Sequence, residues 1–231
     1  AWDLRNRDFT AVSDGQRQRI LLARAICQEP DVIVLDEPTS FLDVRHKLEL
    51  LSILKKMVLE NHVAVVMSLH ELDLAQKISD KVICVKGEVI SWYGEPEQIF
   101  KDDIIQELYG LDNGYFDTVF GSVELPGAMG KPEVFVLSSC GNGVPVYRRL
   151  QKEQIPFATG ILYTNDLDYQ VAKYLAVEVV TERPFCSISD QSLERALKLM
   201  KQCHTIINAG VRIGECNEKM QILLDEATKR E

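Results

Sequence analysis

Two short apolar runs, each followed closely by ionisable residues, stand out in the hydrophobic pattern of the first half of the chain. The first is Val32 to Leu35, followed by Asp36 and Glu37, and the second is Val63 to Met67, followed by His70. An uninterrupted apolar run of this length is typical of a strand buried on both faces of a parallel sheet. Ligands of such sheets bind beyond the carboxyl ends of the strands, where these ionisable residues would emerge.

Helical patterns precede and follow the first run. Ser13 with Gln16 three residues later predicts a capping box, with Ser13 as the N-cap of a helix that extends to about Gln28. The N-terminus of such a helix has free N–H groups and a positive dipole, which favour an anion such as phosphate. Residues 44–61 alternate apolar and polar positions with a helical period, and we expect this helix to pack on the sheet.

Turn signals predict where the secondary-structure elements of residues 81–131 begin and end. Apolar runs on either side of Lys86-Gly87 predict a β-hairpin over residues 81–94, and Gly94-Glu95-Pro96 opens a helix predicted for residues 97–109. Five glycines and a proline between residues 110 and 131 indicate a short β-rich tail followed by a linker. We therefore expect one domain over residues 1–130 and a second over residues 131–231.

The second domain shows regular alternation of strand and helix patterns, which predicts a small Rossmann-like parallel α/β domain. Strands are expected at 134–137, 157–162, 177–181 and 204–208, and helices at 145–153, 166–175, 192–202 and 217–229. Polar residues follow each strand and would converge on one sheet edge, either as ordinary loop residues or as a pocket for a small polar ligand. They are Ser138, Ser139, Asn142, Asn165, Asp166, Asp168, Glu182, Arg183 and Asn208. Gly141-Asn142-Gly143 predicts a turn, since the third glycine of a dinucleotide fingerprint is missing.

The net charge, the cysteines and the lengths of the apolar runs indicate which partners and which compartment to expect. A formal net charge of -9 argues against a nucleic-acid partner, because no dense basic stripe compensates it. The six cysteines are irregularly spaced without a Cys-x-x-Cys pair, which is typical of reduced thiols in the cytosol. No apolar run approaches the roughly 20 residues needed to span a bilayer, and the first residues contain no apolar signal segment.

The two adjacent carboxylates suit a magnesium nucleotide. One carboxylate can hold the cation and the next can orient or deprotonate an attacking water, although a solvated acidic turn is the alternative. A series of linked motifs favours the nucleotide site over the acidic turn. The series is Ser13-Asp14-Gly15-Gln16 opening a helix, then Val34-Leu35-Asp36-Glu37-Pro38-Thr39-Ser40, then Leu42-Asp43, then Ser68-Leu69-His70. In order and spacing this chain resembles the ATPase subunits of ABC transporters.

The resemblance implies a chemical role for three residues. Asp36 would be the Walker B aspartate that holds Mg²⁺, and Glu37 the catalytic glutamate that polarises the attacking water. His70 would contact the γ-phosphate of ATP and stabilise charge in the transition state. ATP and Mg²⁺ are the cofactors that the resemblance implies, and the implied fold is the parallel α/β sheet of a P-loop NTPase.

Four further residues would bind nucleotide across a dimer. Ser13, Gly15 and Gln16 match the signature loop, which caps the γ-phosphate held by the opposite subunit, and Asp43 matches the D-loop. The implied partners are a second copy of the ATPase subunit and membrane permease subunits, which would place the protein on the cytoplasmic face of the membrane. Asp14 departs from the family, because it stands where the common motif has glycine, and its side chain must point away from phosphate.

The P-loop of the family is missing from this sequence. The single Gly-Lys pair is Gly130-Lys131, but Leu125 stands where a P-loop has its first glycine and Pro132 follows the lysine. The P-loop and Q-loop precede the signature helix in the family, so this chain resembles the second half of a cassette. In the family's sheet, the strand that ends at His70 lies between the strand that ends at Asp36 and the P-loop strand.

Two functions are therefore open at this point. The first is an ATP-hydrolysing subunit of an importer, and residues 42–47 are similar to those of ATPases for iron-siderophore, haem and cobalamin uptake. The second is a non-catalytic regulatory or ligand-binding protein built from half a cassette. The missing P-loop predicts that this chain alone is inactive, whereas the matching Asp36, Glu37, Asp43 and His70 favour an ATPase for the complete protein.

Overall fold

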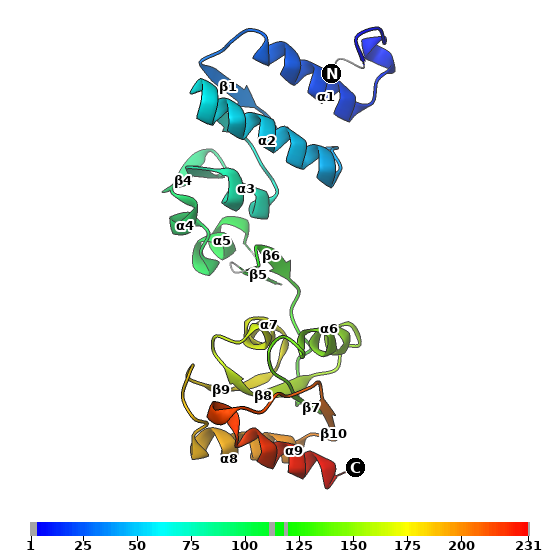
Figure 1. Cartoon of the computed structure of the whole chain (residues 1–231), viewed down its shortest axis with the longest axis vertical. Helices are drawn as coiled ribbons and strands as arrows, with labels where there is room; N and C mark the ends of the chain where they lie inside the picture. Colours follow the sequence, from blue (N-terminus) through cyan, green and yellow to red (C-terminus); the bar gives the residue numbers. More distant parts are fainter. Residues whose placement is uncertain (1–3, 111–113, 118–119, 231) are drawn as a thin grey trace. The chain divides into compact units, whose positions relative to one another are not determined.

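The structure, a computed structural model, describes residues 4–110, 114–117 and 120–230 (Figure 1). The chain divides into two compact units, Ala1–Leu108 and Tyr109–Glu231, which we call unit 1 and unit 2. Each unit is built from parallel strands and helices, so the predicted α/β class with parallel sheets is confirmed. Among the described residues no helix is long and apolar enough to cross a membrane, and all six cysteines are free thiols.

Unit 1 is built around a pair of parallel strands and two helices. Its elements in chain order are a 3-10 helix Phe9–Ala11, α1 Asp14–Ile26, β1 Val32–Leu35, α2 Val44–Asn61, β2 Ala64–Met67, α3 Leu72–Ile78, β3 Val82–Lys86, β4 Val89–Gly94, α4 Pro96–Ile99 and α5 Asp102–Tyr109. Strand β1 pairs with β2 in parallel register, so both strands end at the same sheet edge. Strands β3 and β4 form the predicted antiparallel hairpin.

One face of the β1–β2 pair is covered by helices. Leu22 of α1 and Leu50 and Leu54 of α2 are buried together, and Leu35, Val65 and Met67 from the strands pack against them. Ile33 is buried with Met57 of α2 in an adjoining cluster. Alternate side chains of a strand point to opposite faces, so this face is made by every second residue of each strand.

The other face of the β1–β2 pair is open. Val34 is 75% exposed, Val32 is 55% exposed and Val66 of β2 is 51% exposed. The prediction that the first strand is buried on both faces is therefore wrong for this chain, because none of the described elements covers the second face. Within the described residues the sheet of β1 and β2 also contains no third strand.

One predicted helix start is confirmed, and one predicted helix is interrupted. Ser13 accepts from the backbone N–H of Gln16 while the Gln16 side chain accepts from the N–H of Ser13, so the predicted capping box is confirmed. The helix predicted for residues 97–109 is two helices, α4 and α5. The chain leaves helical geometry at Phe100, with φ -79° and ψ 69°, and buries this ring.

Unit 2 is a four-stranded parallel sheet between two helical layers. Its elements are β5 Tyr115–Asp117, β6 Ser122–Glu124, β7 Val134–Leu137, α6 Val144–Lys152, β8 Phe157–Tyr163, α7 Leu167–Leu175, β9 Glu178–Glu182, α8 Asp190–Gln202, β10 Thr205–Asn208, a 3-10 helix Glu215–Asn217 and α9 Met220–Thr228. The strand order is β10-β7-β8-β9, with α6 and α7 on one face and α8 and α9 on the other (Figure 1). Each face buries its own apolar cluster, so the sheet is covered on both sides.

Unit 2 begins earlier than residue 131, where the glycine-rich stretch had placed the start of a second domain. The β5–β6 hairpin contributes Glu124, whose carboxylate is buried and forms a two-pronged ion pair with Arg148 of α6. The next residue is held as well, because the side chain of Gln151 donates to the carbonyl oxygen of Leu125 at 2.6 Å. These contacts fix the stretch before residue 130 to the sheet domain, which a count of glycines does not foresee.

Candidate functional site

The carboxyl ends of β1 and β2 gather Asp36, Glu37, Ser68 and His70, which we call the carboxylate cluster. The pairing continues beyond β2, since the Ser68 N–H donates to the carbonyl oxygen of Leu35 at 3.0 Å. The Ser68 hydroxyl donates to Oδ1 of Asp36 at 2.8 Å and accepts from the Glu37 N–H at 2.7 Å. The parallel register is the reason that residues more than thirty positions apart meet at one edge.

Glu37 and His70 form an ion pair in this cluster. Nε2 of His70 lies 2.6 Å from Oε1 of Glu37, and the Ser40 hydroxyl donates to the other carboxylate oxygen at 2.9 Å. The hydrogen bond to Glu37 raises the pKa of His70, and the hydrogen bond to His70 lowers the pKa of Glu37. The pair is therefore fully charged between these two pKa values. It weakens as pH rises through the raised pKa of His70 or falls through the lowered pKa of Glu37.

A second set of contacts ties the cluster to α2. Glu71, the residue after His70, pairs with Lys47 of α2 and accepts from the Thr39 hydroxyl at 2.8 Å. The hydrogen bond from Lys47 is the main reason that the pKa of Glu71 is lowered. These contacts join the turn after β1, the turn after β2 and the start of α2, so the three segments that carry the cluster are held together.

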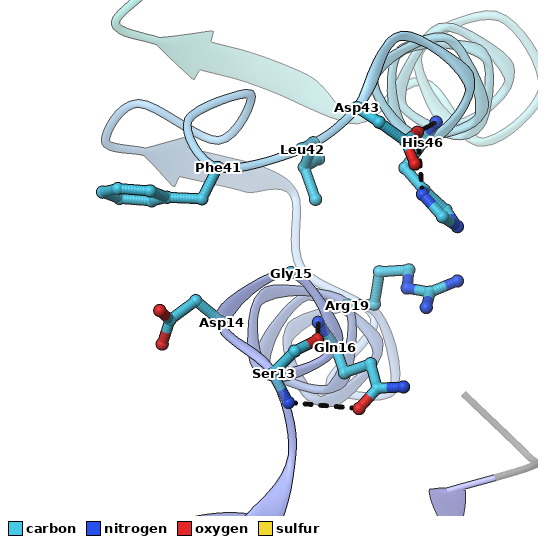
Figure 2. A pocket seen from close by; sticks show the side chains of 9 residues that line it. All are labelled: Ser13, Asp14, Gly15, Gln16, Arg19, Phe41, Leu42, Asp43 and His46. Carbon is cyan, nitrogen blue, oxygen red and sulfur yellow. Dashed lines mark hydrogen bonds and ion pairs between the residues drawn. The ribbon is translucent and has the colours of Figure 1, made fainter.

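The start of α1 and the turn before α2 enclose a pocket of about 460 Å³ (Figure 2). Its lining combines the N-terminus of α1 with the residues around Asp43. They are Ser13, Asp14, Gly15, Gln16, Arg19, Phe41, Leu42, Asp43 and His46. The four candidate nucleotide contacts of the sequence, Ser13, Gly15, Gln16 and Asp43, therefore lie together around one hollow.

Local contacts explain the residue types in this pocket. A side chain at Gly15 would place its Cβ 2.9 Å from Cδ2 of Leu42, so glycine permits the close approach of α1 to the turn. Asp43 caps α2, because its side chain accepts from the His46 N–H at 2.9 Å, and this hydrogen bond lowers the pKa of Asp43. The side chain of Asp14 points away from that of Gln16 (Figure 2). Its carboxylate pairs with Arg17 at 3.4 Å.

The carboxylate cluster fits a magnesium ion that arrives with phosphate. Among the described residues no group of three His, Cys, Asp or Glu side chains is arranged to hold a metal by itself. Asp36 is exposed, and one of its oxygens is engaged with Ser68. Mg²⁺ usually keeps several waters and takes one or two carboxylates together with substrate phosphates, which matches a single exposed carboxylate.

The polar residues of unit 2 mostly hold its loops together. Asp166 accepts from the Cys140 N–H at 3.0 Å, and Asp168, which is fully buried, accepts from the Gly143 N–H at 2.9 Å. Burial is the main reason that the pKa of Asp168 is raised. A carboxylate thus occupies the N-terminus of α6, where a dinucleotide fingerprint would hold pyrophosphate. The sequence Gly141-Asn142-Gly143 is a turn in the structure, as predicted.

Sequence reasoning missed Ser68 of the carboxylate cluster and two residues beside the cluster, Ser40 and Glu71. Ser68 and Ser40 bond directly to Asp36 or Glu37, and Glu71 follows His70 and bonds to Lys47 and Thr39, but the sequence assigned no role to any of the three. Only the register of β1 against β2 shows that Ser68 stands beside Asp36 and Glu37. The sequence alone holds no signal that would have singled it out.

Comparisons with known proteins match this chain to ABC transporter proteins. A family model described as "ABC transporter" matches residues 2–40. An uncharacterised ABC transporter ATP-binding protein of Methanocaldococcus jannaschii is 41% identical over 160 residues, which are 69% of this chain and 55% of that protein. The chain belongs to the family of ABC transporter ATP-binding proteins. Within this family, a cobalamin import ATP-binding protein of Halobacterium salinarum is 30% identical over 199 residues, covering 83% of this chain and 50% of its own length.

The ABC relatives differ in how much of this chain they match. A probable siderophore transport ATP-binding protein of Bacillus subtilis is 34% identical over 110 residues, or 48% of this chain and 40% of its own length. The Halobacterium alignment is longer than unit 1 and therefore includes part of unit 2. A second family model, described as "MJ0874 family", matches residues 157–231 within unit 2. The chain spans about half the length of the curated relatives it matches.

Proposed function

We propose that this chain is the C-terminal part of an ATP-hydrolysing subunit of an ABC importer for a metal chelate such as an iron-siderophore, haem or cobalamin. The observation that carries the proposal is the carboxylate cluster, in which Asp36, Glu37 and His70 meet at the carboxyl edge of parallel strands. The cobalamin and siderophore transport proteins among the relatives support the class of cargo. The whole protein would use ATP and Mg²⁺.

Three residues of the cluster would perform the chemistry. Asp36 would hold Mg²⁺, which when bound neutralises the charge of the phosphate oxygens. Glu37 would orient the attacking water, and its lowered pKa suits polarising a water better than removing its proton completely. His70, which is 74% exposed in its side chain and holds a raised pKa, would donate to the γ-phosphate.

The pocket at the start of α1 would serve a second subunit. Ser13, Gly15 and Gln16 present the N-terminus of α1, whose free amides favour an anion, and Asp43 lies across the hollow from them. We propose that this pocket caps the γ-phosphate bound by the other copy of a homodimer. Docking to membrane permeases would then place the protein at the cytoplasmic face of the membrane.

Steady-state ATP hydrolysis by two proteins tests this proposal. The first is the chain alone, and the second is the chain joined in frame to the P-loop-bearing half of a related ABC ATPase, which we call the joined protein. We expect no turnover by the chain alone, because its sequence contains no P-loop motif, and Mg²⁺-dependent turnover by the joined protein. Turnover by the chain alone, or none by the joined protein when it is folded and binds ATP, contradicts the proposal.

The alternative function is a non-catalytic regulatory or ligand-binding protein. The strand order of unit 2 favours this alternative. The chain adds β8 and β9 on one side of β7 and then crosses over to place β10 on the other side, so the order of the parallel strands reverses between β7 and β10. Ligands of open α/β sheets bind at such a reversal, at the carboxyl ends of the strands, and a small polar ligand would suit the residues there. A joined protein that binds ATP without hydrolysing it favours this alternative over the ATPase.

A further inference from the structure

Ser68 occupies a position from which it contacts two consecutive acidic residues. It directly follows β2, and its N–H donates to the carbonyl oxygen of Leu35, the last residue of β1. This bond extends the parallel pairing by one step and brings the Ser68 side chain beside the turn that starts at Asp36. The position of Ser68 is therefore fixed by the sheet and not by a flexible loop.

The Ser68 hydroxyl is used as a donor and as an acceptor at the same time. It donates to Oδ1 of Asp36 at 2.8 Å, and its oxygen accepts from the backbone N–H of Glu37 at 2.7 Å. A hydroxyl has one hydrogen to donate and two lone pairs, so a single serine can make both bonds. Alanine at this position would lose both bonds together, whereas threonine would keep a hydroxyl on the same carbon.

The backbone at Glu37 needs such support. Its φ is +42°, in the left-handed region that residues other than glycine rarely adopt. The bond from the Glu37 N–H to Ser68 holds this peptide in place. In the same conformation the Glu37 carboxylate reaches Nε2 of His70 at 2.6 Å.

We propose that Ser68 is a positioning residue for ATP hydrolysis, which fixes the direction of Asp36 and Glu37 through one hydroxyl and so sets the Glu37–His70 contact. This inference rests on the proposed function for its role in catalysis. The dependence of the Glu37–His70 pair on Ser68 is a statement about the structure and does not rest on the proposed function. Neither the ABC family model, which matches residues 2–40, nor the motifs of the sequence assign a role to Ser68.

The imidazole of His70 reports on this contact. The charged groups that raise its pKa are Glu37, then Glu71 at the N-cap of α3, and Asp36. Removing the Ser68 hydroxyl leaves Glu71 unchanged and loosens the other two. The pKa of His70 should therefore fall when Ser68 is replaced by alanine, and by less than when the Glu37 carboxylate itself is removed.

The experiment follows the His70 imidazole through a pH titration by NMR in the full chain. The variants are Ser68→Ala, Ser68→Thr and Glu37→Gln, with Ser52→Ala, an exposed serine on α2, as the matched control. We expect the His70 pKa to fall clearly in Glu37→Gln and Ser68→Ala. It should stay at the unsubstituted value in Ser68→Thr and Ser52→Ala.

Two outcomes overturn the inference. If Glu37→Gln lowers the His70 pKa but Ser68→Ala does not, Ser68 does not position Glu37. If Glu37→Gln also leaves it unchanged, the Glu37–His70 pair that Ser68 is said to set does not form in solution. Neither outcome depends on ATP hydrolysis, so a failure here is distinct from a failure of the proposed function.

ATP hydrolysis by the joined protein tests the proposed role of Ser68 in catalysis. Ser68→Ala should lower kcat for ATP hydrolysis by roughly tenfold, because Asp36 and Glu37 lose their fixed direction, while KM for ATP changes little. Ser68→Thr should restore kcat. An unchanged kcat in Ser68→Ala, in a joined protein that hydrolyses ATP, overturns the catalytic role even where the NMR result supports the contact.

Discussion

Glu37→Gln in the joined protein is expected to lower the rate of ATP hydrolysis by roughly 10²–10⁴-fold, the usual contribution of a positioned acid–base group. The amide keeps the shape of the side chain and can still accept from Ser40, but it lacks the negative charge that polarises a water. Binding of ATP should remain, because Glu37 holds neither the metal nor the phosphates in this proposal. Steady-state hydrolysis and equilibrium nucleotide binding measure the two effects separately.

A matched substitution separates chemistry from charge. Glu60→Gln removes the same charge from an exposed position of α2, where Glu60 pairs only loosely with Lys56 at 3.6 Å. We expect its hydrolysis rate to equal that of the unsubstituted joined protein. Near-normal hydrolysis in Glu37→Gln, or an equal loss in Glu60→Gln, would remove Glu37 from the catalytic role.

Arg148→Ala is expected to destabilise unit 2 by about 3–5 kcal/mol, the cost of leaving a buried charge without its partner. Glu124 is 2% exposed and both of its carboxylate oxygens accept from the Arg148 guanidinium. Since Arg148 itself is 37% exposed, we expect a value near the lower end of this range. Hydrogen exchange of the β7 and β8 amides in the full chain measures the free energy of unfolding of unit 2.

The neighbouring arginine is the control for this prediction. Arg149 lies on the same helix and pairs with Glu153 at 2.9 Å, but its side chain is 79% exposed. Exposed ion pairs contribute about 0–1 kcal/mol, so Arg149→Ala should change the free energy of unfolding only slightly. Equal effects of the two substitutions would show that the stability of unit 2 does not depend on the ion pair between the β5–β6 hairpin and α6.

The elements of this fold could be predicted where local chemistry decides them. The capping box of Ser13 and Gln16 and the β3–β4 hairpin follow from a few neighbouring residues, and each is present as predicted. The break at Phe100 and the ion pair between Glu124 and Arg148 could not be foreseen, because both depend on burial against distant parts of the chain.

In the candidate site, too, residues marked by the local sequence could be predicted, and residues placed by strand pairing could not. Asp36, Glu37 and His70 could be singled out because each directly or closely follows an apolar run, and the structure brings them together. Ser68 could not, because its role depends on the register between β1 and β2. The burial of β1 on one face only could not be predicted either, since periodicity does not show which faces of a strand pack against other elements.

We infer that β1 and β2 belong to a larger sheet, which the P-loop-bearing half completes next to β2. Ala64 and Ser68 donate their N–H groups to β1. Successive N–H groups of a strand point to opposite sides, so those of Val65 and Met67 point to the open edge. Residue-resolved hydrogen exchange of Val65 and Met67, compared between the chain alone and the joined protein, tests this claim most directly.

We expect the Val65 and Met67 amides to exchange much faster than those of Ala64 and Ser68 in the chain alone, and to become protected in the joined protein. The Ala64 and Ser68 amides, which already bond to β1, serve as internal references. Protection of Val65 and Met67 in the chain alone, or equally fast exchange of both in the joined protein, would contradict the claim that β2 receives a strand from the missing half.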